Sequence, residues 1–140
     1  MAEQLIEQKL ESLRRCVARV QERIPETSEA LAGDPDSQDI VALNLTRAIQ
    51  LCVEIASHWV SRHPELPAPQ SMGEAFELLA RAGVIDPALA NQLRHSVGFR
   101  NIMVHAYEEV DWRIVHAIGT EHLDQFRQFA RHIAEAAVLT

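Results

Sequence analysis

The sequence is short of basic residues. Among its 140 residues, 13 Lys and Arg stand against 20 Asp and Glu, which gives a formal net charge of −7. A protein that coats nucleic acid through a broad basic surface needs many phosphate contacts, so this charge balance excludes that class. It leaves open a small nucleic-acid site with a few local cations, or a basic protein partner.

Cysteine is scarce as well. The two cysteines, Cys16 and Cys52, lie far apart in helical patterns, and neither belongs to a CxxC or a Cys/His motif. The 7 histidines form no HExxH motif, so we expect no metal and no cofactor. We find no signal peptide and no uninterrupted apolar run of about 18 residues or more. The chain is therefore expected to be a cytoplasmic protein with reduced thiols and no membrane contact.

Aromatic, proline and glycine residues are also few. Aromatic residues make up 5% of the chain and hydrophobic residues 47%, so any core must consist mainly of Leu, Ile, Val and Ala. The 6 prolines and 5 glycines cluster in short stretches between helical patterns, and strand-like alternation is absent. The sequence predicts a single all-α domain over residues 1–140, an up-and-down bundle of four long helices and one short helix.

Apolar spacing and capping residues define the expected helices. Ser71 and Glu74 have the form of a capping box, Asp86-Pro87 reads as an N-cap followed by a first-turn proline, and Asp111 is a further N-cap. The second long helix is apolar on several sides, so a second subunit could cover one of them. The expected helices span about residues 3–24, 35–62, 71–82, 86–106 and 112–138, with a short turn at 28–31.

The fourth expected helix ends in GFRNIMVHAY, residues 98–107, where polar side chains interrupt an apolar run that should be buried. Burying Arg100, Asn101, His105 or Tyr107 is costly unless each is paired or used. On an ideal helix Arg100 and Tyr107 share a stripe, whereas Arg100 and His105 lie about 140° apart around the axis and about 7.5 Å apart along it. One rigid helix does not bring both to the same atom, but two motifs facing each other across a two-fold axis would.

The residue types in this stretch suit RNA cleavage without a metal ion. A histidine can take the proton of a ribose 2′-OH or give one to the leaving 5′-oxygen. An arginine can hold the scissile phosphate and the charge that develops on it. Asn101 would orient the imidazole of His105 or bind a phosphate oxygen. Two copies of His105 could supply base and acid, or a single histidine could act with arginine support.

The Arg-x4-His spacing alone is not specific, because Arg127 and His132 repeat it in RQFARH. The fuller pattern RNIMVHAY closely resembles the Arg-x4-His-x-Tyr motif of the HEPN superfamily, specifically the HepT toxins of prokaryotic HepT–MntA toxin–antitoxin pairs. LNLTRAIQLCVEIASHWV at 43–60, SMGEAFELLARAGVI at 71–85 and the stretch 93–112 follow the layout of that family in the same order. The likeness covers about residues 36–120.

The resemblance implies a homodimeric ribonuclease whose composite site forms where two motifs meet. Arg100 and His105 would be the catalytic pair and Asn101 a supporting residue. Tyr107 would be the tyrosine that an MntA-like nucleotidyltransferase antitoxin modifies with AMP, and this AMPylation would silence the nuclease by adding bulk and negative charge beside the site. We expect a metal-independent endoribonuclease toxin of a type VII pair that leaves 2′,3′-cyclic phosphate ends on its RNA substrate.

Each of these residues also has a simpler, purely structural explanation. Arg100 could pair with a carboxylate such as Glu108, and His105 could simply be favoured by a helix C-terminus. Arg47 and Glu54 share a stripe of the second long helix; they are either solvated residues or line the cleft opposite the motif, where Arg47 would support RNA binding. The alternative function is a non-catalytic helical subunit that docks a minimal nucleotidyltransferase.

Overall fold

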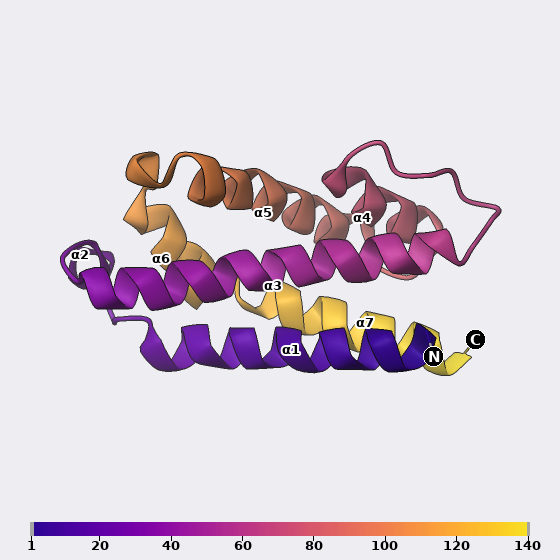
Figure 1. Ribbon diagram of the computed structural model, residues 1–140, viewed down its shortest axis with the longest axis horizontal. Coiled ribbons are helices and arrows are strands. Elements are labelled where there is room, and N and C mark those ends of the chain that lie inside the picture. The colour runs from indigo at the N-terminus through magenta and orange to yellow at the C-terminus, as the bar shows by residue number, and fades with distance from the viewer. Residues whose placement is uncertain (1, 140) are drawn as a thin grey trace.

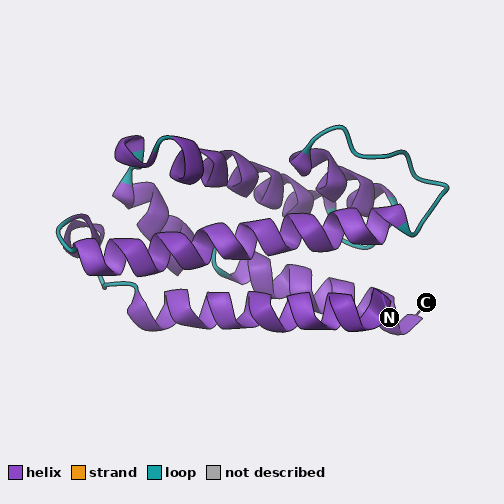
Figure 2. Cartoon of the chain, viewed as in Figure 1, coloured by secondary structure: helices purple, strands orange, loops and turns teal. Residues whose placement is uncertain are grey.

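The computed structural model describes the backbone of residues 2–139 and the side chains of residues 4–137. All elements in this part of the chain are helical, which confirms the predicted all-α bundle (Figure 2). They are α1 (Ala2–Arg23), α2 (Ser28–Ala32), α3 (Pro35–Ser61), α4 (Met72–Arg81), α5 (Pro87–His105), the 3-10 turn η1 (Tyr107–Glu109), α6 (Trp112–Thr120) and α7 (Asp124–Leu139).

Helix α3 is the centre of the bundle. Its most extensive packing is against α1 (Figure 1). It also packs against α2, α4, α5, α6 and α7. Helices of the same chain therefore bury most of the apolar side chains of α3, but Leu43 is 51% exposed, and its cover by a second subunit stays a prediction. By length and composition α3 could also cross a membrane, yet half of its most apolar window is buried in the bundle, as in the core helix of a soluble fold.

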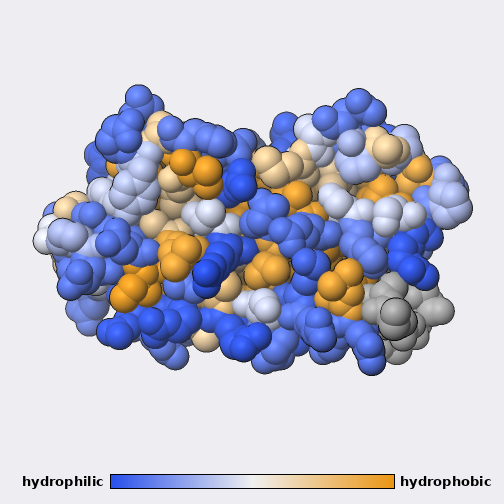
Figure 3. All heavy atoms as spheres, viewed as in Figure 1, coloured by the Kyte–Doolittle hydropathy of each residue, from blue (hydrophilic) through white to orange (hydrophobic). Residues whose placement is uncertain are grey.

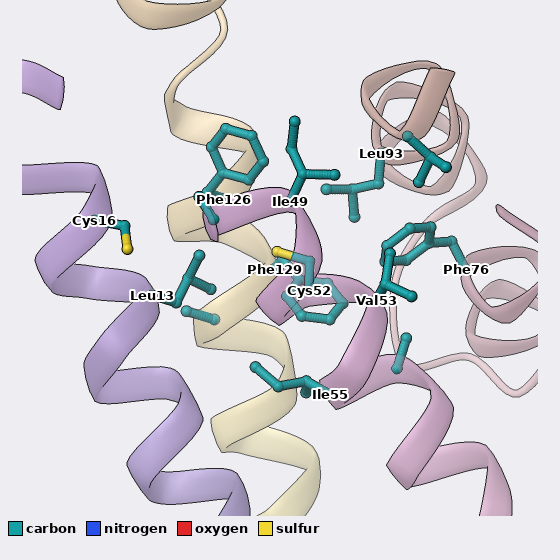
Figure 4. Packing of buried hydrophobic residues seen from close by; sticks show 14 of the residues in the cluster. Leu13, Cys16, Ile49, Cys52, Val53, Ile55, Phe76, Leu93, Phe126 and Phe129 are labelled. Atoms are coloured by element: carbon teal, nitrogen blue, oxygen red, sulfur yellow. The ribbon is translucent and has the colours of Figure 1, made fainter. Parts of the chain in front are cut away.

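The core is built around three phenylalanines from two helices. Phe76, Phe126 and Phe129 are fully buried, and the rings of Phe76 and Phe129 meet edge to face with centroids 5.8 Å apart (Figure 4). Cys16 and Cys52 lie in the same cluster as free thiols. Aliphatic side chains fill the remaining space, as the low aromatic content predicts.

Local capping sets most helix starts where the sequence predicts them. The side chain of Ser71 accepts a hydrogen bond from the Glu74 amide at 3.2 Å, and Asp86 accepts one from the Leu89 amide at 2.8 Å. Asp111 caps α6 in the same way. Each bond satisfies an amide that has no partner within its own helix.

The prediction of one continuous helix over 112–138 is wrong, because the chain breaks between α6 and α7. The amides of Glu121 and His122 both donate to the carbonyl of Ala117, at 2.8 and 3.2 Å, and this closes α6. Gly119 packs so closely on Ile24 that a Cβ atom there would collide with it. The break lets α6 pack against α2 while α7 turns back along α1.

Candidate functional site

The polar motif lies at the C-terminal end of α5, close to the N-terminal half of α3 (Figure 1). Arg100 is half-buried, and its Nη1 donates to the Oδ1 of Asn101 at 3.0 Å. Its Nε is buried and has no partner within the described side chains. An unpaired buried donor costs free energy, so a bound anion that drew the guanidinium outward would recover that cost. In this protomer, the hydrogen bond from Nη1 to Asn101 is the contact that the structure shows for the guanidinium.

His105 is the last residue of α5 and its side chain is exposed. Within the described part of the chain, no hydrogen bond or ion pair joins His105 to Arg100. This agrees with the angular and axial separation that an ideal helix imposes on the two positions. One protomer thus presents the two groups of the expected catalytic pair without bringing them together.

Tyr107 does not lie on the same helical stripe as Arg100, contrary to the sequence-based prediction. Ala106 leaves the helix with φ −144° and ψ 55°, and Tyr107 begins the turn η1. The Tyr107 hydroxyl donates to Oδ1 of Asp39 at 3.4 Å, and its ring meets that of Trp112 edge to face at 5.8 Å. Partial burial, together with the charge and hydrogen bond of Asp39, raises the pKa of Tyr107. The hydroxyl is accessible and protonated at neutral pH.

Exposed apolar side chains gather at this end of the bundle. The structure describes six large hydrophobic residues as exposed; three of them lie in the motif, Leu43 lines a cavity together with two of these, and Leu5 and Ile114 lie elsewhere in the sequence. Ile102 and Val104 are 45% and 47% exposed, so the expectation that the apolar run is buried is wrong for them. Such a patch is typical of a protein–protein contact. The other three are Leu43, Tyr107 and Ile114.

A small cavity of about 260 Å³ opens within this patch. Tyr107, Val104 and Met103 line it on one side, and Asp39 and Leu43 of α3 line it on the other. Sequence spacing could not place Asp39 here, because 68 positions separate it from Tyr107. It is the residue at this site that sequence reasoning missed.

Arg47 and Glu54 do not line the cavity beside Tyr107, and the RNA-binding role of Arg47 stays a prediction. They line a separate groove between α1 and α3, with a volume of about 720 Å³. Nζ of Lys9 contacts Oε1 of Glu54 at 2.7 Å, and this hydrogen bond lowers the pKa of the carboxyl. Arg47 is exposed.

The second Arg-x4-His pair provides an internal comparison. Arg127 donates to Oε1 of Gln21 at 2.7 Å, and His132 lies 3.8 Å from the carboxylate of Glu135. Both members therefore have local partners on the outside of the bundle. The two pairs share a spacing but differ in surroundings.

Comparisons with known proteins identify relatives along nearly the whole chain. A family model described as ribonuclease HepT-like matches residues 13–133. The mRNA nuclease HepT of Shewanella oneidensis is 38% identical over 125 residues, which cover 89% of this chain and 92% of that protein.

Solved structures agree with these sequence matches. A tri-AMPylated Shewanella oneidensis HEPN toxin in complex with MNT antitoxin has a TM-score of 0.84 and 36% identity, covering 93% of this chain and 96% of that one. A toxin–antitoxin solved with AMP-PNP has a TM-score of 0.82 and 36% identity over 91% and 96% of the two chains. The cytosolic protein YutE of Bacillus subtilis, 13% identical with a TM-score of 0.82 over 96% and 89%, shares the fold alone.

Proposed function

Because the chain belongs to the HepT-like ribonuclease family, we propose that it is an endoribonuclease toxin of a type VII toxin–antitoxin pair. The observation that carries the proposal is the placement of Arg100 and His105. Both lie at the solvent-facing end of α5, one with an unsatisfied donor and the other exposed. The arrangement offers a cation and a proton-transfer group at one surface.

The active form is a homodimer in which the motifs of two protomers face each other. The apolar side chains around the motif, including Ile102 and Val104, support this arrangement because a dimer contact would cover them. Each site then pairs Arg100 of one protomer with the partner's His105. Asn101 holds the guanidinium that it already contacts.

Cleavage proceeds by attack of the RNA on itself. His105 takes the proton of the ribose 2′-OH, and the 2′-oxygen bonds to phosphorus as the bond to the 5′-oxygen breaks. The leaving 5′-oxygen takes up a proton from a protonated His105. Arg100 stabilises the charge on the phosphoryl oxygens. The products are a 2′,3′-cyclic phosphate and a 5′-OH, and the step needs no metal-bound water.

Tyr107 is the proposed point of control. An antitoxin of the nucleotidyltransferase class would transfer AMP from ATP to the Tyr107 hydroxyl, with pyrophosphate as the leaving group. The hydroxyl is within reach of such a partner, and the solved HEPN toxin with TM-score 0.84 is described as tri-AMPylated. The adenylate would place negative charge and bulk at the edge of the motif.

Expression in cells and cleavage assays test the proposal together. Wild-type protein should arrest growth and cut RNA in the presence of a chelator, leaving 2′,3′-cyclic phosphate ends. Arg100→Ala and His105→Ala should abolish both effects while the dimer persists in sedimentation. The matched control is Arg127→Ala with His132→Ala, which has the same spacing and should stay toxic.

Two outcomes would contradict the proposal. Toxicity lost equally in the control would show that the substitutions act through folding. A wild-type chain that is harmless, inert on every RNA and still captures a nucleotidyltransferase would be the non-catalytic docking subunit. Control by AMPylation is tested separately by intact mass, which should rise by AMP units on co-expression with the antitoxin and stay unchanged in Tyr107→Phe.

A further inference from the structure

The groove between α1 and α3, hereafter the α1/α3 groove, concentrates positive charge in an acidic protein. Arg15 and Arg19 come from α1 and Arg47 from α3, and all three line its volume of about 720 Å³. Figure 3 shows hydrophilic and hydrophobic side chains intermingled on the face where these helices lie side by side. The chain as a whole carries a formal charge of −7, yet three arginines line this groove. Arg14, Arg127 and Arg131 line a second pocket, but there Arg14 and Arg127 have carboxylate partners.

The positive charge of this groove is not neutralised within the protomer. In the described part of the chain, Arg15 and Arg47 make no hydrogen bond or ion pair. Arg19 pairs only with Glu22, at 3.3 Å on the exposed side of α1. The carboxylate that lines the groove, Glu54, is already paired with Lys9. The groove therefore keeps a surplus of cationic groups without partners.

A buried cysteine lines the groove together with the arginines. Cys16, which is only 7% exposed, lines the groove between the arginines. Burial raises the pKa of its thiol, and the positive charges of Arg47 and Arg15 partly oppose that rise. Arg15, on α1, and Arg47, on α3, therefore face the same groove from its two walls.

The α1/α3 groove adjoins the motif. Leu43 lines both the groove and the cavity of Tyr107 and Val104. A chain molecule lying in the groove can therefore pass over Leu43 to the end of α5.

We propose that the α1/α3 groove binds the phosphodiester backbone of single-stranded RNA next to the scissile link. This inference rests on the proposed nuclease function and extends its binding site beyond the motif. One arginine guanidinium can donate two parallel hydrogen bonds to the oxygens of a phosphate. An exposed guanidinium without a partner breaks no interaction within the protein when it binds a phosphate in this way. Arg15 and Arg47 contact phosphates, and Asn44, whose Nδ2 donates to the carbonyl of Ile40 at 2.8 Å, adds a neutral polar side chain to the groove.

Equilibrium binding tests the groove without requiring cleavage. A fluorescent single-stranded RNA oligonucleotide is titrated with full-length His105→Ala protein over a range of salt concentrations. Adding Arg15→Gln and Arg47→Gln should weaken binding by about tenfold or more at low salt, since two charge-assisted contacts are lost. The slope of log affinity against log salt should become shallower by about 1.4, or about 0.7 per phosphate contact. Lysine at both positions should keep the wild-type slope.

The matched control removes two other exposed arginines, Arg62 and Arg81, which lie outside the groove. The control should keep both the affinity and the slope of the parent. An Arg15/Arg47 variant that behaves like the control overturns the proposal. So does a variant that keeps its RNA affinity but loses dimerisation or capture of the antitoxin, because the groove would then be a protein interface. If wild-type protein binds RNA through the groove but never cleaves it, the proposed function fails and this inference stands.

Discussion

A mixed dimer offers the sharpest test of how the proposed catalytic pair, Arg100 and His105, is assembled. In the described part of one protomer, no hydrogen bond or ion pair joins Arg100 to His105, so each proposed site should draw its arginine from one chain and its histidine from the other. A dimer of one Arg100→Ala chain with one His105→Ala chain then contains one intact site and one site that lacks both groups. Purified through two different tags, it should cleave RNA at about half the wild-type rate per dimer.

The two parent homodimers supply the baseline. Each lacks one group at both sites and should fall by about 10²-fold or more. If the two variant chains are co-expressed and the dimers are not separated, about one half of the dimers are mixed. The activity of this mixture should be about a quarter of the wild-type activity. A purified mixed dimer no more active than its parents would refute assembly across the interface. It would favour a site within one protomer, or one that needs both copies of His105.

Three further predictions concern the stability and titration of the chain. Tyr107 is the single tyrosine, so ultraviolet titration reports it alone; its pKa should lie above the ordinary value and fall in Asp39→Asn, and an unchanged value would contradict the Asp39 contact. Lys9→Met should cost at most about 1 kcal/mol at pH 7, because both side chains are partly exposed. The pKa of Glu54 is lowered in the folded protein, so the stability lost in Lys9→Met should be full above about pH 4.3, the pKa of an unfolded Glu. In urea melts, this difference between the two proteins should disappear as the pH falls through the lower, folded pKa of Glu54. Phe129→Ala should lower the free energy of unfolding by about 3–5 kcal/mol in the same melts, and a loss below about 1 kcal/mol would contradict the described core.

Features that depend on neighbouring residues were predictable from the sequence. The caps at Ser71, Asp86 and Asp111 use amides within three positions, so the residue types alone place the helix starts. The motif and its family likeness are equally local, since they occupy one continuous stretch. The helical fold and the candidate catalytic residues therefore follow from the order of residues along the chain.

Features that depend on distant contacts were not predictable. Gly119 lies in the last turn of α6, where it packs closely on Ile24. That contact joins parts of the chain that are remote in sequence. Tyr107 meets Asp39 only because α5 stops at His105 and the next turn bends toward α3. Arg47 shares a stripe with Glu54 in the sequence, but only the packing of α1 shows that the stripe faces a groove.

The position of Tyr107 gives one modification two consequences if the proposed function and the groove are both correct. Tyr107 and Leu43 line the same cavity, and Leu43 also borders the α1/α3 groove. An adenylate on Tyr107 would carry a phosphate anion at the junction between the motif and the RNA track. It would remove the O–H donor of the contact with Asp39 and set a second negative charge against that carboxylate. Silencing would then act on RNA binding as well as on cleavage, so the adenylated protein should bind RNA more weakly than Tyr107→Phe, which keeps the groove and adds no charge.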